Sequence, residues 1–427
     1  MLQAIYSQVE ACVRWDSVLS EFFDCPAGVR QGAKESPIIF SFLMSVIADY
    51  VRERGRHGVQ LLQDKPEIYS LIFADDVALV STTAVGLQTQ LDSLDSISTQ
   101  LGLTINRKKS KIMVFRRGGF LSRGERWTLG GDSLEVVSKY KYLGYFFTSR
   151  LSDTAMLENQ NVKAKQRTVS LVQFLFRTRN FNSSVFFHLF DAQILPVLMY
   201  GAELWGIGRH DPVEKAHMFA CKHFMNLATR TPNCFIYGEL GRYPLYINAA
   251  LRAVKYWLKL CRMPLDRLPK QAYLMLTNMN VKGRVNWTNS VKQFLFQLGF
   301  GYVWNDCGTR NENAFLKSLK VRLRDCFQQE WHGRLSNSER FFTYRSFKKS
   351  FETEQYINDL KIKKFRDAFI RFRLGVNELN ANKWYEQNQS SNCPFCVNTI
   401  ENEKHFYRLP IVQIYQTKVF KSIPECC

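Results

Sequence analysis

Two short apolar runs, 69–72 and 77–80, flank a tip that carries Asp75 and Asp76. Apolar runs of this length on either side of a short turn predict a β-hairpin. Two adjacent carboxylates at such a tip repel each other and lower stability unless cations neutralise them. The pattern therefore predicts a cation-binding turn, and a solvated Asp-rich turn is the alternative.

Helical periodicity predicts three helices in the N-terminal third of the chain. Apolar residues at positions 5, 9, 12 and 13 form one face of a helix over residues 1–20. Ser36 and Pro37 suit the N-cap and first turn of a helix over 36–54, whose first half is apolar all round and should be buried. Regularly spaced leucines predict an amphipathic helix over 87–101.

Strand-like segments follow these helices. Residues 103–106 and 111–115 are strand-like on either side of a basic turn, and the aromatic run 140–147 predicts a strand or a hairpin. Helices and short strands in this order, joined by short loops, are typical of an α+β domain with a small antiparallel sheet.

The pattern becomes mostly helical from about residue 155. Helical spacing marks residues 157–177, 183–206, 213–229, 246–262 and 313–330. We therefore predict four domains, at residues 1–150, 151–262, 263–385 and 386–427. A weak domain boundary lies inside residues 263–290.

A basic segment lies at residues 340–374, which contain ten Arg and Lys residues and only four acidic residues. The apolar residues of its last helix share one helical face, which predicts core packing for Ile362, Phe365, Phe369 and Phe372. The cations opposite this face could follow an RNA backbone, and a solvated face is the alternative.

The composition limits the partners and the compartment. The chain carries 58 Lys and Arg against 38 Asp and Glu, a net charge of +20 that favours a polyanion such as RNA or DNA, with an anionic membrane surface as the competitor. We expect no membrane span and no secretion signal, because no apolar run is long enough and the N-terminus lacks a basic region before an apolar one. Eleven cysteines without a framework pattern favour an intracellular location, nuclear or cytoplasmic.

Four blocks stand in a fixed order along residues 28–144. They are 28–32 with Ser36 and Pro37, the Asp-Asp tip, residues 101–111, and Tyr142 to Gly144. In order and spacing they resemble the reverse transcriptases of non-LTR (LINE-type) retrotransposons. Residues 196–206, 237–244 and 393–405 resemble later parts of the same proteins. The resemblance implies a partial polymerase palm, followed by helical thumb-like and C-terminal regions.

The resemblance also implies roles for individual residues. Asp75 and Asp76 match the residues that hold catalytic Mg²⁺, with Mn²⁺ as an alternative. Lys109 matches a lysine that is proposed to neutralise or protonate the leaving pyrophosphate. An ordinary solvated basic turn is the alternative for Lys109. The positions that match the nucleotide- and template-binding loop are Arg30, Gln31, Gly32, Ser36 and Pro37.

Tyr142, Leu143 and Gly144 resemble the hairpin that grips the primer end. An aromatic core strand is the alternative, and both descriptions can hold at once.

Glycine at position 32, in the loop that matches the nucleotide- and template-binding loop, lets a backbone approach the substrate closely. An ordinary glycine turn before a helix would look the same.

Two departures from the family pattern stand out. The strand that carries the first catalytic aspartate in relatives is absent, which predicts that this chain alone is an incomplete polymerase. Cys393, Cys396 and His405 resemble a zinc knuckle, but the cysteine expected near position 410 is missing. Zinc binding therefore lacks a fourth ligand unless Cys426 or Cys427 supplies it in a different geometry, and an unliganded tail is the alternative.

The expected activity is RNA-directed DNA synthesis from dNTPs on an RNA template, with a DNA primer or target end. The alternatives are a catalytically inactive RNA- or DNA-binding remnant of a transposable element and a decayed reading frame whose product does not fold stably. The sequence does not determine the oligomeric state.

Overall fold

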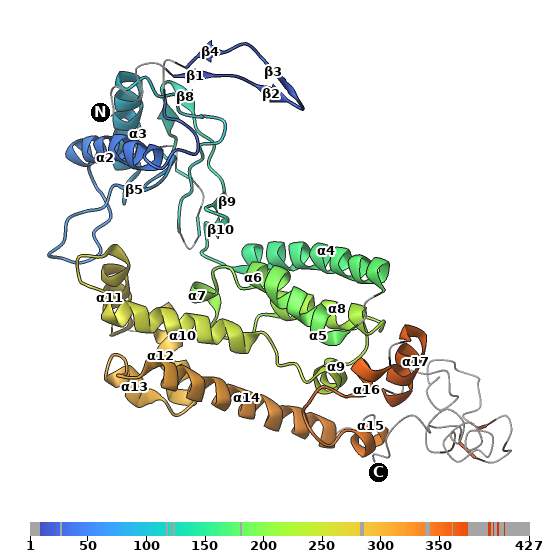
Figure 1. Cartoon of the computed structure of the whole chain (residues 1–427). Helices are drawn as coiled ribbons and strands as arrows, with labels where there is room; N and C mark the ends of the chain where they lie inside the picture. Colours follow the sequence, from blue (N-terminus) through green and yellow to red (C-terminus); the bar gives the residue numbers. More distant parts are fainter. Residues whose placement is uncertain are drawn as a thin grey trace. The chain divides into compact units, whose positions relative to one another are not determined.

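The computed structural model describes residues 9–25, 28–116, 118–119, 121–122, 124–179, 182–281, 286–337, 342–360, 362–374, 392–393, 396, 399–400 and 405. The chain forms two compact units (Figure 1). The first is Met1–Tyr142 with Phe147–Ser152, and the second is Leu143–Phe146 with Asp153–Cys427. Among the described residues, no helix has the length and apolar character that a membrane crossing needs.

The first unit is built on one hairpin and two helices. Strands β5 (Ser70–Phe73) and β6 (Asp76–Leu79) pair antiparallel, and α2 (Ser36–Arg54) packs against both β5 and α3 (Ala84–Gln100). The buried side chains between these elements are Met44, Ile47, Val51, Leu94 and Ile97. The predicted α+β class and the helices over 36–54 and 87–101 are confirmed.

Helix α2 is buried on one side only. Its outer side exposes Ile38 at 61% and Phe42 at 70%, whereas Ile47 and Val51 are almost completely buried. The prediction of a helix buried all round in its first half is therefore wrong. An apolar residue is buried only where a second element covers it, and the described part of this unit covers only the inner side.

Residues 9–25 form short strands where we predicted a helix. β1 (Glu10–Ala11) pairs with β4 (Phe23–Asp24), and β2 (Arg14–Trp15) pairs with β3 (Val18–Leu19). The chain reverses at Asp16, whose φ of +51° is tolerated because aspartate adopts left-handed conformations more readily than most residues. The helix predicted over residues 1–20 is thus wrong for 9–20, and residues 1–8 lie outside the described residues.

The two strand-like segments around the basic turn are also not regular strands. Residues 103–106 have no strand pairing, and 111–115 contribute a single bridge between Ile112 and Val136. The reason is local, because the backbone N–H groups of Lys109 and Ser110 both donate to the Asn106 carbonyl. Nearby, β7 (Thr128–Leu129) and β8 (Asp132–Ser133) form another small hairpin.

The aromatic run forms the predicted hairpin. Strand β9 (Lys139–Tyr142) pairs with β10 (Tyr145–Thr148) across a two-residue turn at Leu143 and Gly144. The division between the two compact units falls within this hairpin, so its tip belongs to the second unit and the rest to the first.

The second unit is helical, and α4 lies beside α8 while α10 lies beside α7 and α14 (Figure 1). Its first helices are α4 (Thr154–Thr178), α5 (Ser183–Leu189), a π-helix (Phe190–Ile194), α6 (Leu195–Leu198), α7 (Ala202–Trp205), α8 (Asp211–Phe224), α9 (Asn233–Leu240) and α10 (Tyr246–Arg262). The later helices are α11 (Leu268–Val281), α12 (Trp287–Gln297), α13 (Gly301–Asn305), α14 (Glu312–Ser336), α15 (Phe342–Phe347), α16 (Tyr356–Asp359) and α17 (Lys363–Arg373).

One hydrophobic cluster runs through this unit from Leu157 to Leu374. It includes residues on both sides of the boundary that we predicted inside 263–290. The predicted domain boundaries stay predictions, and most of residues 386–427 lie outside the described residues.

Helix α17 turns a different face inward than predicted. Its buried residues are Arg366, Asp367, Ile370 and Arg373, while Ile362 and Phe365 are each 60% exposed. The prediction of core packing for Ile362 and Phe365 is wrong, and Arg366 and Arg373 do not belong to a solvent-facing basic surface. Phe369 is half-buried and packs edge-on against Tyr356.

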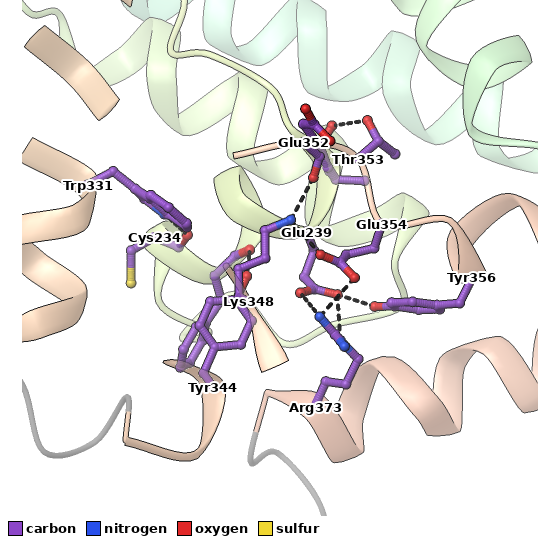
Figure 2. Close-up of polar contacts among 12 residues, drawn as sticks. Cys234, Glu239, Trp331, Tyr344, Lys348, Glu352, Thr353, Glu354, Tyr356 and Arg373 are labelled. Carbon is purple, nitrogen blue, oxygen red and sulfur yellow. Dashed lines mark hydrogen bonds and ion pairs between the residues drawn. The ribbon is translucent and has the colours of Figure 1, made fainter. Parts of the chain in front are cut away.

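Ion pairs among buried charged residues explain why this face of α17 points inward (Figure 2). The Arg373 guanidinium contacts the Glu239 carboxylate at 3.1 Å and the Glu354 carboxylate at 3.0 Å. Lys348 donates to Glu354 at 2.6 Å, and the Tyr356 hydroxyl donates to Glu239. Two cations balance two carboxylates in this cluster, which joins α9 to α16, α17 and the segment before them.

Replacing Arg373 by alanine should lower the free energy of unfolding by about 3–5 kcal/mol, because Glu239 would stay buried without its ion-pair partner. Chemical denaturation measures this difference. Lys364→Ala is the matched control, since Lys364 is exposed on the same helix and its loss changes the net charge equally. Equal stabilities of the two variants would contradict a supporting role for this cluster.

Candidate functional site

The Asp-Asp tip is a two-residue β-turn in the first unit. Register pairs Ser70 with Leu79 and Phe73 with Asp76, which leaves Ala74 and Asp75 as the turn residues. Ala74 has φ +52°, a conformation that disfavours any residue with a Cβ. Both carboxylates are exposed to solvent, so cations can reach them.

One residue of strand β9 senses the charge of this turn. Burial, and after it the negative charge of Asp76, raise the pKa of Tyr142, which places the phenol within electrostatic range of that carboxylate. One predicted primer-contacting residue therefore lies within electrostatic range of one predicted metal ligand. Leu143 and Gly144 follow directly as the hairpin turn, with φ of +47° and +82°, the pattern of a type I′ turn.

Strand β9 also contacts the segment that carries Lys109. The Tyr140 hydroxyl donates to the Lys109 carbonyl at 3.0 Å, while the Lys109 side chain is exposed. Tyr140 and Tyr142 share one face of the strand, since residues two apart point to the same side. Sequence reasoning missed Tyr140, although this alternation was the signal that could have identified it.

The predicted nucleotide-binding loop leads into α2. Arg30, Gln31 and Gly32 are exposed, and Pro37 lies in the first turn of the helix. Ser36 does not cap the helix as predicted, because Glu35 is the N-cap residue and makes no side-chain capping bond. Instead the Ser36 hydroxyl donates to the Arg30 carbonyl at 2.6 Å and closes the loop.

A second candidate site lies near the C-terminus. One ligand atom each from Cys393, Cys396 and His405 lies within 4.8 Å of the other two. Two sulfurs and one imidazole nitrogen are a donor set that suits Zn²⁺. Cys426 and Cys427, the alternative sources of a fourth ligand, lie outside the described residues.

Comparison with known proteins agrees with this geometry. Residues 2–147 match the family model described as reverse transcriptase (RNA-dependent DNA polymerase). This matching segment contains the Asp-Asp turn, Lys109 and nearly all of the β9–β10 hairpin.

Two curated relatives are both described as the retrovirus-related Pol polyprotein from type-1 retrotransposable element R2. The protein of Nasonia vitripennis is 28% identical over 130 residues, which cover 29% of this chain and 12% of the relative. The protein of Popillia japonica is 23% identical over 249 residues, which cover 56% of this chain and 33% of the relative. The chain is thus related to the reverse transcriptases of non-LTR retrotransposons, and the matches span a third or less of these relatives.

Asp76→Asn should lower the pKa of Tyr142, because it removes a negative charge that opposes ionisation of the phenol. NMR titration of ¹³C-labelled tyrosine, assigned with Tyr142→Phe, measures this change. Asp75→Asn is the control and should have the smaller effect. A Tyr142 pKa that is the same in Asp76→Asn and the unmodified chain would contradict the described proximity.

Proposed function

We propose that this chain acts in RNA-directed DNA synthesis as part of a retrotransposon reverse transcriptase. The observation that carries the proposal is the exposed Asp75–Asp76 turn, within the segment that matches the reverse transcriptase family. Exposure matters because a carboxylate pair that faces solvent can bind cations and phosphate-bearing substrates together.

The proposed chemistry is attack of a primer 3′-hydroxyl on the α-phosphate of a dNTP, with release of pyrophosphate. Asp75 and Asp76 would hold Mg²⁺, or alternatively Mn²⁺, which supplies charge stabilisation for the entering and leaving oxygens when bound. Exposed carboxylates at a turn fit such an ion, since Mg²⁺ accepts one or two protein carboxylates and takes its other ligands from phosphates and water.

The remaining residues would bind and orient the substrates. Lys109, exposed on its turn, would neutralise the leaving pyrophosphate. Arg30, Gln31 and Gly32 would contact the incoming nucleotide and the template, in a loop that Ser36 closes through the Arg30 carbonyl. Tyr142, Leu143 and Gly144 would contact the primer end.

The partners in this proposal are an RNA template, a DNA primer or target end, and dNTPs. The net charge of +20 supports a polyanionic partner. We place the reaction inside the cell, in the nucleus or the cytoplasm, in keeping with the cysteine pattern.

A second candidate function is nucleic-acid binding without polymerisation. One observation favours it: among the described residues, Asp75 and Asp76 have no third acidic, histidine or cysteine side chain that completes a metal-ligand group. Two carboxylates alone hold a pair of divalent cations weakly. Activity measurements distinguish the two functions.

We also propose that Cys393, Cys396 and His405 bind Zn²⁺ as a structural site. The support is the convergence of their ligand atoms within 4.8 Å. Bound zinc would fix the segment around Cys393, where the backbone N–H donates to the Thr399 carbonyl at 2.8 Å.

Asp75→Ala should abolish primer extension by the purified chain on an RNA template with Mg²⁺, because the ion would lose a carboxylate ligand. Incorporation of labelled dNTP measures the activity. Asp64→Ala is the matched control, since Asp64 is an exposed aspartate of the same unit outside the turn. Activity that persists in Asp75→Ala would contradict the proposed site.

A chain that never incorporates dNTPs but still binds labelled RNA would favour the second function. Affinity should then fall steeply with salt, because phosphate contacts release counterions.

Cys393→Ser should remove zinc from the purified protein, because the site would lose one of three described ligands. Elemental analysis after dialysis measures the metal content. Cys326→Ser is the control, since Cys326 is exposed and lies outside the cluster. An unmodified protein that retains no zinc would contradict this site.

A further inference from the structure

The hydroxyl of Tyr200 contacts the tip of the β9–β10 hairpin within the second unit. It donates to the Leu143 carbonyl at 2.5 Å. The phenol ring also lies beside Gly144, where a Cβ atom would be 3.5 Å from the hydroxyl oxygen. One side chain therefore contacts both residues of the turn.

The main chain that carries Tyr200 is held firmly. Its carbonyl accepts hydrogen bonds from Gln160 Nε2 at 2.7 Å and from Trp205 Nε1 at 3.1 Å. The preceding carbonyl, of the fully buried Met199, accepts from Arg252 Nη1 at 3.1 Å. The phenol thus extends from a backbone that three other elements fix in place.

A second contact fastens the same tip. Gly201 has φ +73°, and a Cβ atom there would lie 2.7 Å from Tyr145 Cε2, so only glycine lets the Tyr145 ring pack at this distance. The Tyr145 hydroxyl in turn donates to Asp153 at 2.5 Å, and burial followed by this bond raises the pKa of Tyr145.

The turn that Tyr200 contacts is strained. Leu143 has φ +47°, a conformation that branched and bulky L-residues rarely adopt and that hairpin turns usually assign to Asn, Asp or Gly. A strained residue persists where the surrounding structure determines its position, and such residues cluster at functional sites. Here the Tyr200 hydroxyl and the Tyr145–Asp153 pair supply that surrounding structure.

We propose that Tyr200 is a positioning residue for the primer. Through its bond to the Leu143 carbonyl it orients the Leu143–Gly144 turn, and the turn orients the primer 3′ end. The inference rests on the proposed function, because it needs the turn to contact a primer. Tyr200 itself contacts the turn and takes no part in the chemistry.

The contact between Tyr200 and Leu143 is partly exposed to solvent, so a positioning role and a purely structural role predict different effects on stability. Tyr200 is 46% exposed and Leu143 is 39% exposed, so water can replace the lost hydroxyl at the carbonyl. Removing the hydroxyl should therefore leave global stability nearly unchanged while the turn becomes less ordered.

Tyr200→Phe in the full chain tests the proposal. We expect the KM for a primer–template duplex to rise about 3- to 10-fold, the effect of one lost hydrogen bond, with kcat within about twofold of the unmodified value. Backbone amides at 143–146 should exchange hydrogen faster, with an unchanged melting temperature. Tyr302→Phe is the matched control, since Tyr302 is 60% exposed on α13 of the same unit.

Gly201→Ala is a second, independent variant. Its methyl group would displace the Tyr145 ring and should raise the KM for the duplex in the same direction without touching the Tyr200 hydroxyl. Tyr200→Phe with unchanged exchange at 143–146 would overturn the proposal, and so would faster exchange with an unchanged KM.

The outcome for the unmodified chain keeps the two proposals apart. If that chain extends no primer, the proposed polymerase function fails. Duplex affinity, measured by fluorescence anisotropy with a labelled primer–template, then replaces KM. In that case, a Tyr200→Phe variant that binds the duplex as tightly as the unmodified chain would overturn the positioning role.

Discussion

The β9–β10 hairpin is the constraint on which the candidate site depends. Tyr142 in its stem lies within electrostatic range of Asp76, and Tyr140 donates to the Lys109 carbonyl. Its tip is bound by Tyr200 within the helical unit. Strand β9 thus carries one residue that senses the charge of a proposed metal ligand and one that hydrogen-bonds the segment of the proposed pyrophosphate-binding lysine.

Burial separates the two sets of charged residues in this protein. Asp75 and Asp76 are exposed on a turn, where ions and phosphates can reach them. Glu239 and Arg373 are buried and neutralise each other, so they join helices and are closed to ligands. Only the second has its partners inside the fold, and this decides whether a charge binds ligand or supports structure.

Local patterns predicted local elements well. The hairpin around Asp75, the helix after it and the aromatic hairpin each depend on contacts between residues close in sequence. Predictions about burial were weaker. The outer side of α2 and the Ile362 and Phe365 positions of α17 are exposed, because periodicity shows that a face is apolar without showing which element covers it. The helix predicted over 1–20 is wrong for residues 9–20, since short apolar segments suit either period.

The sequence by itself indicated the relation to reverse transcriptases, the α+β class and the candidate ligands, because these depend on residue types in a fixed order. Only the tertiary structure decided that Tyr200 binds the carbonyl of Leu143, 57 residues away, and that Arg373 pairs with Glu239, 134 residues away. Hydrogen bonds and ion pairs between such distant residues leave no trace in local periodicity. They form only when packing of the helices brings their backbones together.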